Sequence, residues 1–534
     1  MNRERSGGDT VAAGIWNKEK ENFSRGKGIS RKIFLQLEKP TEEDSRSYQQ
    51  RILDGLKGKN IDSRMTIRTM GKLYPLCDQA EWEITVSLAW DGVQWWIVDA
   101  EAGDTTAFHY GYAVDMGSTT VAVQLWNCET GECLWEADSY SRQISYGTDI
   151  LTRIFYCKDD PDKRKELQKA SIDTILDILK EIEKNTGIGP ERCIQMVIAG
   201  NTTMIHFLLD MDAFCVFSTP YAVRADCPGF FGGTELGIPV KGFLYCYPGK
   251  SNYLGGDIIS GVAAMGLHKS EEIQVFFDIG TNGEIVIGNK EFLLCGAGAA
   301  GPALEGGSVR TGMRACEGAV DRVTIQDGKV CCHVIGGETA KGICGSGIIE
   351  LLSELFLHGW INFLGKLQPE KSSLIRTMDG LPALEYAPGL YFWQEDIDEF
   401  IKTKAAASTM VEYMFRESGL SLDKVSRFYV AGAFGKHVNK EAAITIGMYP
   451  DMDRERLVSA GNASLAGAGM LLMDKSMLND LDEILDKMVY IQFGAVEDFL
   501  HMMVAAQAIP HTDMERYPTV RKKLAEIEEK NKGA

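Results

Sequence analysis

The sequence predicts an α/β protein of two lobes, preceded by a small N-terminal α+β domain. Apolar strands alternate with helices whose apolar residues recur at helical spacing, which is typical of α/β folds. Two of the strands also end in the same kind of turn, Asp-x-Gly followed by small hydroxyl or amide residues. One lies in Tyr112–Thr120 and the other in Phe276–Glu284. We therefore expect a duplicated fold whose lobes close on one ligand.

The N-terminal part is expected to hold a tail and a small domain. Residues 1–30 mix glycine with charged residues without periodicity, which favours a mobile tail. Residues 31–110 are assigned to a linker and a small middle domain of α+β type. Its expected elements are a helix at Tyr48–Leu56 and strands at Lys32–Leu37, Trp82–Leu88 and Gln94–Val98.

The remainder of the chain repeats one alternation of strands and helices. The first lobe is placed at residues 111–270. Its apolar residues between Ile172 and Ile182 recur at helical spacing, and Gly187 fits the left-handed end of the helix that they predict. The strand Gln195–Ala199 follows this helix. The second lobe has expected helices at Ile348–His358 and Lys402–Ser418 and a strand at Ser426–Ala431. We place the boundaries of the two-lobed domain at 111–510, with lobe II at 271–460, a return helix and C-terminal elements at 461–510, and a tail at 511–534.

Composition excludes several classes of function. A chain of 534 residues accommodates two to four domains. The net charge of −19, from 56 basic and 75 acidic residues, argues against nucleic acid as a partner. No apolar run reaches the ~20 residues of a membrane span. Thirteen cysteines without an export signal are best explained by reduced thiols, so we expect a cytoplasmic protein.

The two Asp-x-Gly turns indicate phosphate chemistry. No Walker A sequence occurs, which excludes the P-loop mode of nucleotide binding. A strand that ends in Asp-x-Gly can present a carboxylate to hydrated Mg²⁺ and backbone N–H groups to phosphate oxygens. We therefore predict that Asp115 and Asp278 hold Mg²⁺ through water molecules. The alternative is that each is a turn carboxylate without a ligand. The predicted phosphate-binding residues are Gly117, Ser118, Thr119, Thr120, Gly280, Thr281, Asn282 and Gly283.

Three further polar positions follow strands or open helices. Asn201 and Thr202 open an apolar helix, where an N-cap and a phosphate contact are compatible roles. Asp257 precedes another helix, and we leave two roles open for it: capping that helix or contacting the hydrated metal. Glu284 is a predicted polar group near the γ-phosphate.

This set of turns resembles the superfamily of acetate kinase, sugar kinases, Hsp70 and actin. Within it, the chain is most similar to the ATP-dependent reductive activators of corrinoid proteins, over roughly residues 31–510. The motifs that carry this narrower resemblance are Gly200–Met204, Asp278–Glu284, Ala299–Gly306, Gly312–Ala315, Gly342–Gly347, Ala431–Gly435 and Gly461–Gly467.

The resemblance implies an actin/Hsp70-like ATPase fold that binds ATP and Mg²⁺. It assigns the catalytic role to Asp115, Asp257 and Asp278. It also implies that two glycine-containing segments flank the adenosine, where a planar base must lie close to backbone. Their residues are Gly345, Ser346, Gly432, Ala433 and Phe434, and for Phe434 core packing is the alternative.

The sequence departs from the family in two features linked to electron transfer. Members of the family commonly carry cluster-binding cysteines, whereas here no C-x₂-C spacing occurs, so no iron–sulfur cluster is expected. Cys128 and Cys133 flank an expected hairpin turn, and the adjacent Cys331 and Cys332 should point to opposite faces of a strand. Gly296-Ala297 stands where relatives often carry polar residues.

Two functions remain open on the sequence alone. The first is ATP-dependent activation of a corrinoid protein of a methyltransferase system, with reduction of Co(II) to Co(I) by an external donor of the ferredoxin type. The second is a nucleotide-dependent regulatory protein that remodels a corrinoid or methyltransferase partner without redox chemistry. Neither requires a membrane, and a homodimer is compatible with both.

Overall fold

A computed structural model describes residues 26–280, 282–299, 301, 303, 306–337, 339–432, 438–493 and 497–533. The chain forms two compact units. The Asp115 unit holds the described residues up to Gly266 together with Ala463–Asp486, and the Asp278 unit holds Leu267–Asn462 and the described residues from Lys487 onward. Residues 1–25 of the expected N-terminal tail lie outside the described residues.

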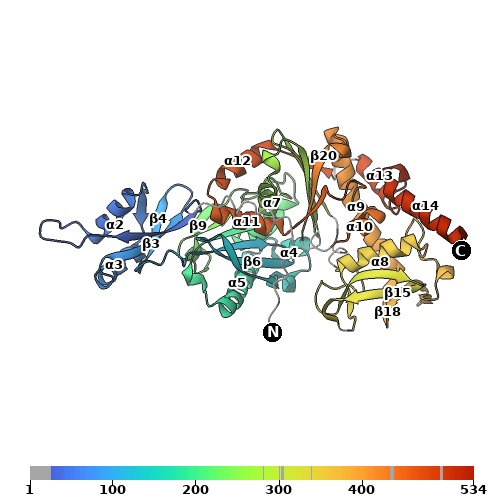
Figure 1. Cartoon of the computed structure of the whole chain (residues 1–534), viewed down its shortest axis with the longest axis horizontal. Coiled ribbons are helices and arrows are strands. Elements are labelled where there is room, and N and C mark those ends of the chain that lie inside the picture. Colours follow the sequence, from blue (N-terminus) through green and yellow to red (C-terminus); the bar gives the residue numbers. More distant parts are fainter. Residues whose placement is uncertain are drawn as a thin grey trace. The chain divides into compact units, whose positions relative to one another are not determined.

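The Asp115 unit begins with a four-stranded sheet, here called the linker sheet, in the order β1-β3-β4-β2. Helices α2 and α3 lie beside this sheet (Figure 1), and Ser47 and Thr66 cap their N-termini. The predicted helix and three strands are present, and β4 extends beyond the expected Val98. The bounds are Ser30–Gln36 for β1, Tyr48–Lys57 for α2, Ser63–Met65 for β2, Ile67–Gln79 for α3, Glu83–Trp90 for β3 and Trp95–Ala102 for β4.

A six-stranded sheet forms the centre of the Asp115 unit, in the order β7-β6-β5-β8-β10-β9. Its long helix α5 starts after the capping residue Asp160 and ends at Gly187, whose φ of 71° is left-handed as predicted. The strands are β5 Tyr110–Met116, β6 Thr120–Asn127, β7 Glu132–Tyr140, β8 Cys193–Gly200, β9 Gly229–Gly232 and β10 Phe243–Cys246. The helices are α4 Ile150–Cys157, α5 Pro161–Thr186, α6 Thr202–Leu208, α7 Gly256–Met265, α11 Ala463–Met473 and α12 Met477–Lys487.

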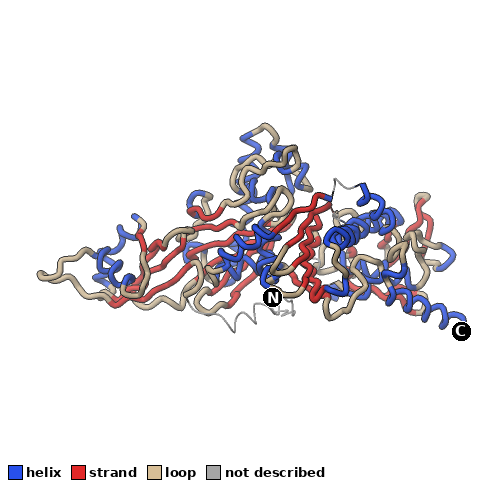
Figure 2. Tube along the Cα trace, turned by 90° about the horizontal axis from the view of Figure 1, so that it is seen from above, coloured by secondary structure: helices blue, strands red, loops and turns tan. Residues whose placement is uncertain are grey.

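The Asp278 unit has a second six-stranded sheet, in the order β21-β20-β11-β12-β13-β22. Strands of this unit are drawn in red in Figure 2, beside the helices in blue. The bounds are β11 Ile273–Ile279, β12 Asn282–Gly288, β13 Leu293–Ala299, β20 Val425–Ala431, β21 Leu457–Gly461 and β22 Met488–Gln492. Two three-stranded sheets accompany it: β14 Ala319–Gln326 with β15 Lys329–Val334 and β16 Gly342–Ile343, and β17 Ile375–Met378 with β18 Leu381–Ala387 and β19 Leu390–Trp393.

The helices of the Asp278 unit differ from the sequence prediction in two places. Helix α9 starts eight residues before the expected Lys402, because Asp396 accepts a hydrogen bond from the Trp393 N–H and so caps the first turn. The expected C-terminal tail contains a helix, α14. The bounds are α8 Gly345–Leu357, α9 Gln394–Ser418, α10 Lys440–Thr445, α13 Glu497–Ala506 and α14 Pro518–Gly533.

The two six-stranded sheets share one topology over five strands. In each, three consecutive antiparallel strands, β5-β6-β7 or β11-β12-β13, form a meander. Two parallel strands then follow beside the first strand of the meander: β8 and β10 in one sheet, β20 and β21 in the other. The repeated turn of the sequence is therefore part of a repeated sheet.

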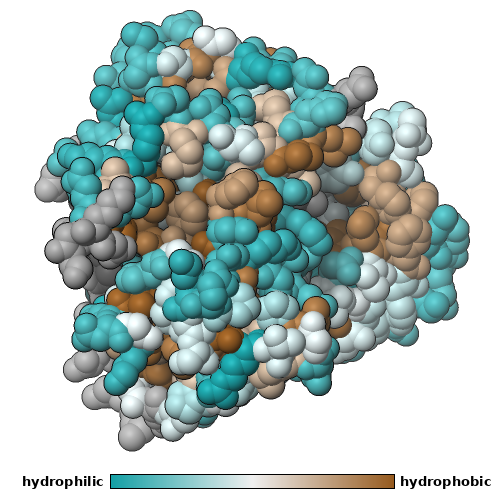
Figure 3. Space-filling model, turned by 90° about the vertical axis from the view of Figure 1, so that its right-hand side faces the viewer, coloured by the Kyte–Doolittle hydropathy of each residue, from teal (hydrophilic) through white to brown (hydrophobic). Residues whose placement is uncertain are grey.

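Some large apolar side chains are exposed on the surface instead of being buried in the core. On the face shown in Figure 3, hydrophobic groups gather in a band among hydrophilic ones. Exposed apolar side chains of the Asp278 unit include Phe363, Leu364, Leu500 and Val504. None of the helices in the described ranges combines the length and hydropathy that a bilayer-spanning helix needs.

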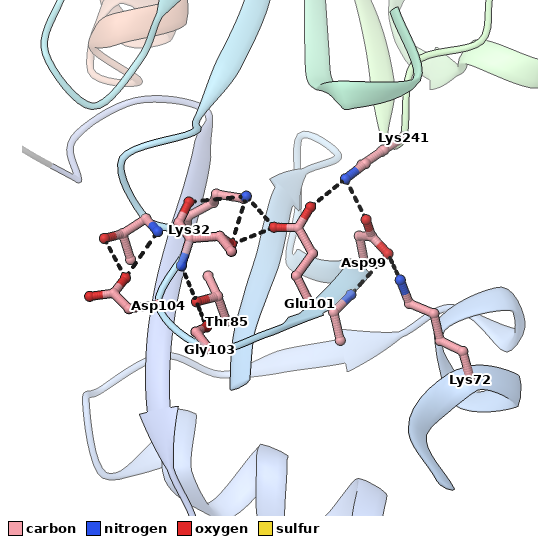
Figure 4. A network of polar contacts seen from close by, with 11 residues as sticks. Lys32, Lys72, Thr85, Asp99, Glu101, Gly103, Asp104 and Lys241 are labelled. Atoms are coloured by element: carbon pink, nitrogen blue, oxygen red, sulfur yellow. Dashed lines mark hydrogen bonds and ion pairs between the residues drawn. The ribbon is translucent and has the colours of Figure 1, made fainter. Parts of the chain in front are cut away.

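A network of lysines and carboxylates attaches the linker sheet to the Asp115 sheet (Figure 4). Lys241, which precedes β10, forms ion pairs with Asp99 and with Glu101, at 3.0 Å for the latter. Lys32 and Lys72 pair with Glu101 and Asp99 from the side of the linker sheet. These five side chains are no more than 40% exposed, so solvent screens their pairing only in part.

Candidate nucleotide site

Asp115 lies at the end of β5 and is held from a second element. The Ser464 hydroxyl at the start of α11 donates a hydrogen bond of 2.8 Å to its Oδ1. The turn that follows is tight: a Cβ on Gly117 would lie 2.5 Å from the Thr120 carbonyl oxygen. Only glycine fits such a close approach of backbone, so the turn itself selects this residue. Residues 117–120 remain half-buried and thus reachable by a ligand.

Asp257 is not the N-cap residue of α7, but its Oδ1 accepts a hydrogen bond of 2.9 Å from the Ile258 N–H in the first turn of that helix. Helix α7 begins at Gly256 after Gly255 as N-cap, and Asp257 is its second residue. Burial raises the pKa of Asp257 above its usual range, and the negative charge of Asp115 raises it further. Two carboxylates that repel one another beside a phosphate-type turn form a donor set suited to a hydrated divalent cation. The residues present therefore fit Mg²⁺, and their metal role stays a prediction.

The turn at Asn201 packs against both of these carboxylate-bearing elements. The Asn201 side chain accepts a hydrogen bond of 2.9 Å from the Met204 N–H, which confirms the predicted N-cap of α6. Thr202 donates to the Ser251 carbonyl at 3.0 Å. A Cβ on Gly255 would lie 2.5 Å from the Asn201 Cα, and one on Gly200 would lie 2.9 Å from Met116. The ends of β5 and β8 and the start of α7 are thus in direct contact.

Arg153 is a residue of this site that the sequence did not reveal. Its side chain is fully buried on α4, and its Nη1 donates a hydrogen bond of 2.6 Å to the Ser118 carbonyl in the phosphate-type turn. Nε donates to the Gly147 carbonyl at 2.8 Å, while Nη2 is buried without a hydrogen-bond partner. Burial lowers the pKa of Arg153 to about 10, which still leaves it charged at neutral pH. No local pattern signals this contact, which spans 35 residues.

Asp278 has the equivalent position in the Asp278 unit. It pairs with Ala431 of the parallel strand β20, as Asp115 pairs with Ala199 of β8. The residue after each of these alanines is glycine. At Gly432, φ is +94° and a Cβ would lie 2.9 Å from the Asp278 Oδ1 and 2.5 Å from the Ile279 carbonyl oxygen. Gly432 therefore contacts the predicted metal-side carboxylate directly.

The second phosphate-type turn is also closely packed. Gly280 N–H donates to the Asn282 carbonyl at 2.8 Å, which closes the turn. A Cβ on Gly283 would lie 2.5 Å from the Met410 Cε. Glu284 is buried on β12 directly opposite Asp278, so the predicted polar group lies beside the predicted metal side. Thr281 lies outside the described residues.

The residues predicted to flank adenosine are only partly described. Gly345 and Ser346 form the first turn of α8, where Ser346 is buried and its hydroxyl lies 3.2 Å from the Cys344 sulfur. Asn439 Nδ2 donates to Glu350 of α8 at 3.0 Å. Asn439, the residue before α10, thus contacts α8. Ala433 and Phe434 lie outside the described residues.

One histidine and the cysteines singled out in the sequence make structural contacts. His206 is buried on α6 and hydrogen-bonds to the Thr202 carbonyl at 2.6 Å. Cys128 and Cys133 flank the turn between β6 and β7, and on β15 Cys331 is exposed whereas Cys332 contacts the Tyr386 carbonyl. Across the described ranges, no group of three or more His, Cys, Asp or Glu side chains is arranged to hold a metal ion.

Comparison with known proteins identifies the class and then the family. A family model described as the C-terminal domain of RACo, the ASKHA domain, matches residues 272–521. A model of the RACo linker region matches residues 28–107, and a model of the RACo middle region matches residues 110–270. In this family, the middle region is therefore the segment that was called the first lobe above. The fold is thus that of an ASKHA ATPase, as expected. The chain belongs to the family of reductive activators of corrinoid proteins.

The relatives agree with this assignment. A solved structure, the reductive activator for corrinoid, iron–sulfur protein, is 34% identical with a TM-score of 0.86, over 92% of this chain and 81% of that one. The corrinoid activation enzyme RamQ of Eubacterium limosum is 28% identical over 68% of this chain. The chain spans 64% of the length of RamQ. The [Co(II) methylated amine-specific corrinoid protein] reductase of Methanosarcina barkeri is 24% identical over 71% of this chain and 72% of its own length.

Proposed function

We propose that this protein is an ATP-dependent activator that promotes reduction of Co(II) to Co(I) in a corrinoid protein of a methyltransferase system. The observation that carries the proposal is the likeness to a reductive activator over 92% of the chain, at a TM-score of 0.86. The names of the curated relatives, a corrinoid activation enzyme and a Co(II) corrinoid protein reductase, support it.

The proposal gives the site residues a common task in ATP hydrolysis. Bound Mg²⁺ would neutralise part of the phosphate charge and orient the phosphates for attack by water. Asp115 and Asp257 of the Asp115 unit and Asp278 of the Asp278 unit are the carboxylates that we assign to binding that ion. The half-buried turn at Ser118 and Thr119 and the turn at Asn282 would donate to phosphate oxygens. The repeated Asp-x-Gly sequence and the repeated sheet topology support a phosphate-binding role for both turns.

The redox step transfers one electron. An external donor of the ferredoxin type would lose the electron and cob(II)amide in the partner would gain it, while ATP and water give ADP and phosphate. For a one-electron couple, each ~59 mV of potential changes the equilibrium ratio tenfold. A complex in which Co(II) loses an axial ligand has a higher cobalt potential, and the free energy of ATP hydrolysis would drive formation or release of that complex.

A reduction assay tests the proposal. The protein, ATP, Mg²⁺ and reduced ferredoxin are added anaerobically to an oxidised corrinoid protein, and the Co(I) absorbance is followed. We expect Co(I) to appear only with ATP present. If ATP is hydrolysed and the complex is remodelled while no Co(I) forms, the protein is a regulatory partner without a redox role.

A binding assay tests whether ATP binding changes the affinity for the corrinoid protein. Calorimetric titration of the corrinoid protein, with and without a non-hydrolysable ATP analogue, should give affinities that differ by a factor of roughly 5–150, the usual range for couplings of ~1–3 kcal/mol. Equal affinities in both conditions would leave ATP binding without a role in partner recognition. A ferredoxin-type donor and a homodimer stay predictions.

A further inference from the structure

An open cavity of about 560 Å³ lies between the linker sheet and the turn that joins α11 to α12. All its walls belong to the Asp115 unit. Its volume is within the range of small-molecule sites in proteins, roughly 300–1,000 Å³. The lining includes Lys27, Arg31 and Trp90 from one side and Asp474, Lys475 and Asp482 from the other.

Two cations of the cavity are positioned by indole rings. The Lys475 Nζ lies 3.6 Å from the centre of the Trp90 ring, and the Arg31 guanidinium carbon lies 4.5 Å from the centre of the Trp95 ring. The rings themselves meet edge to face, with centres 5.3 Å apart. Cation–π contacts of this kind fix the direction of two otherwise flexible side chains. The Lys475 N–H also donates to the Lys27 carbonyl at 2.9 Å, which fixes the backbone.

These cations are not paired with either of the carboxylates, Asp474 and Asp482, that also line the cavity. Within the described part of the chain, neither Arg31 nor Lys475 forms an ion pair, and the Arg31 Nε is buried without a hydrogen-bond partner. Burial lowers the pKa of both groups, and the charge of Arg31 lowers that of Lys475 further. The nearest carboxylate in sequence, Asp474, instead accepts hydrogen bonds from Ser476 at 2.8 and 2.7 Å. Two like charges held close together favour an anion between them.

We propose that this cavity binds a small soluble anion whose phosphate or carboxylate group lies between Arg31 and Lys475. The ligand would accept hydrogen bonds from Lys475 and from the accessible part of the Arg31 guanidinium, and it would relieve the repulsion between the two cations. Such a charge-assisted hydrogen bond is stronger than a neutral one. The site is separate from the candidate nucleotide site, and it would exist whether or not the protein activates a corrinoid partner.

The position of the cavity connects it to the nucleotide site through one helix. Helix α11 carries Ser464, the donor to Asp115, in its first turn, and it ends at Met473, directly before Asp474 and Lys475. Eleven residues of α-helix span roughly 16 Å. An anion bound at Lys475 would therefore stabilise the C-terminal end of α11, whose first turn holds Asp115 through Ser464.

The test is a titration of the full chain, without nucleotide or Mg²⁺, at constant ionic strength maintained with NaCl. Inorganic phosphate and malonate are the two probes, followed by calorimetry and by tryptophan fluorescence, since Trp90 lies under Lys475. We expect saturable binding of at least one probe. Lys475→Gln and Arg31→Gln should each weaken it at least tenfold. Lys180→Gln, a change at a lysine that is 74% exposed on α5, should leave it unchanged.

Folding and the source of the anion are controlled separately. Trp90→Phe should keep the calorimetric binding and reduce the fluorescence change, so the proposal does not depend on one variant being folded. If phosphate and malonate bind equally well to the parent and to both charge variants, the signal comes from another site and the proposal fails. It fails as well if only a glutamate-rich twelve-residue peptide binds, because the cavity is then a protein-docking surface.

Discussion

Asp115 and Asp278 occupy the same place in two sheets of the same topology, and each is paired with an alanine that precedes a glycine. We predict that Asp115→Ala and Asp278→Ala each abolish Mg-ATP hydrolysis and leave the fold intact, because they remove metal-side charge and little core volume. Loss of a metal contact should cost several kcal/mol of transition-state stabilisation. Asp138→Ala, at an exposed residue of β7, is the control. Hydrolysis by Asp278→Ala at the parental rate would show that the second turn is misassigned.

Arg153 combines a charge with a hydrogen bond to the first phosphate-type turn. Replacement by Met keeps most of the buried volume and removes the bond to the Ser118 carbonyl. A hydrogen bond to a charged group contributes about 1.5–3 kcal/mol, so we expect the KM for ATP to rise by roughly tenfold or more. Steady-state ATPase kinetics measure this effect, and Arg153→Lys should recover part of it. An unchanged KM with lowered stability alone would assign Arg153 to packing.

At the scale of single elements, Gly419 at the end of α9 and Gly432 directly after β20 form a matched pair of glycines. Gly432 and Gly419 both have left-handed φ, of +94° and +64°, but a Cβ at Gly419 meets nothing within 4 Å. Both alanine variants should lose about 1 kcal/mol of stability for the backbone conformation. Only Gly432→Ala should also weaken ATP binding, since its Cβ would displace the Asp278 carboxylate. Calorimetric ATP titration of the two variants distinguishes the outcomes, and equal affinities would separate Gly432 from the site.

Local patterns predicted the elements well and the tertiary contacts poorly. The cap at Asn201 and the left-handed Gly187 follow from rules that involve only a few neighbouring residues, and both are confirmed. The role of Asp257 could not be resolved in this way, because its raised pKa depends on burial in the folded chain and on the charge of Asp115, which is distant in the sequence. The contact of Arg153 with the Ser118 carbonyl could not be predicted either, because the two residues are far apart in the sequence. The same applies to Lys404, a fully buried lysine whose Nζ donates to the Ala506, Ala508 and Pro510 carbonyls at 2.5–2.6 Å.

At the scale of the whole molecule, the carboxylates of the linker network make stability depend on pH. Burial alone would raise the pKa of Glu101, but hydrogen bonds from Lys32 and Thr105 and the charge of Lys241 outweigh it and lower the pKa to about 2. Lys241 and Lys72 likewise lower the pKa of Asp99 against the effect of burial. Because both folded-state pKa values are depressed, this stabilisation is complete above the unfolded values of roughly 4–4.5 and is lost as pH falls toward 2.

The expected loss from Glu101 is about 2–3 kcal/mol of unfolding free energy. Urea unfolding of the parent and of Lys241→Met between pH 6 and pH 2.5 measures it. The variant should be less stable at pH 6 and should show a weaker pH dependence. Lys290→Met, which removes an exposed ion pair with Glu271, provides the control. Parallel pH profiles for the parent and Lys241→Met would show that the network does not titrate as described.

The attachment of the linker sheet has a mechanical consequence. Besides the lysine network, Gln195 of β8 donates to the Trp90 carbonyl at 2.7 Å, and Ala89, Val98 and Ile194 form a shared apolar cluster. Because charged, polar and apolar contacts all join the two sheets, we expect rotation of the linker sheet against the sheet that ends at Asp115 to be restrained. We therefore expect the two sheets to move together as one rigid body. A small tilt of the Asp115 turn would then be transmitted to the tip of the linker as a larger displacement, in proportion to its distance from the axis of rotation.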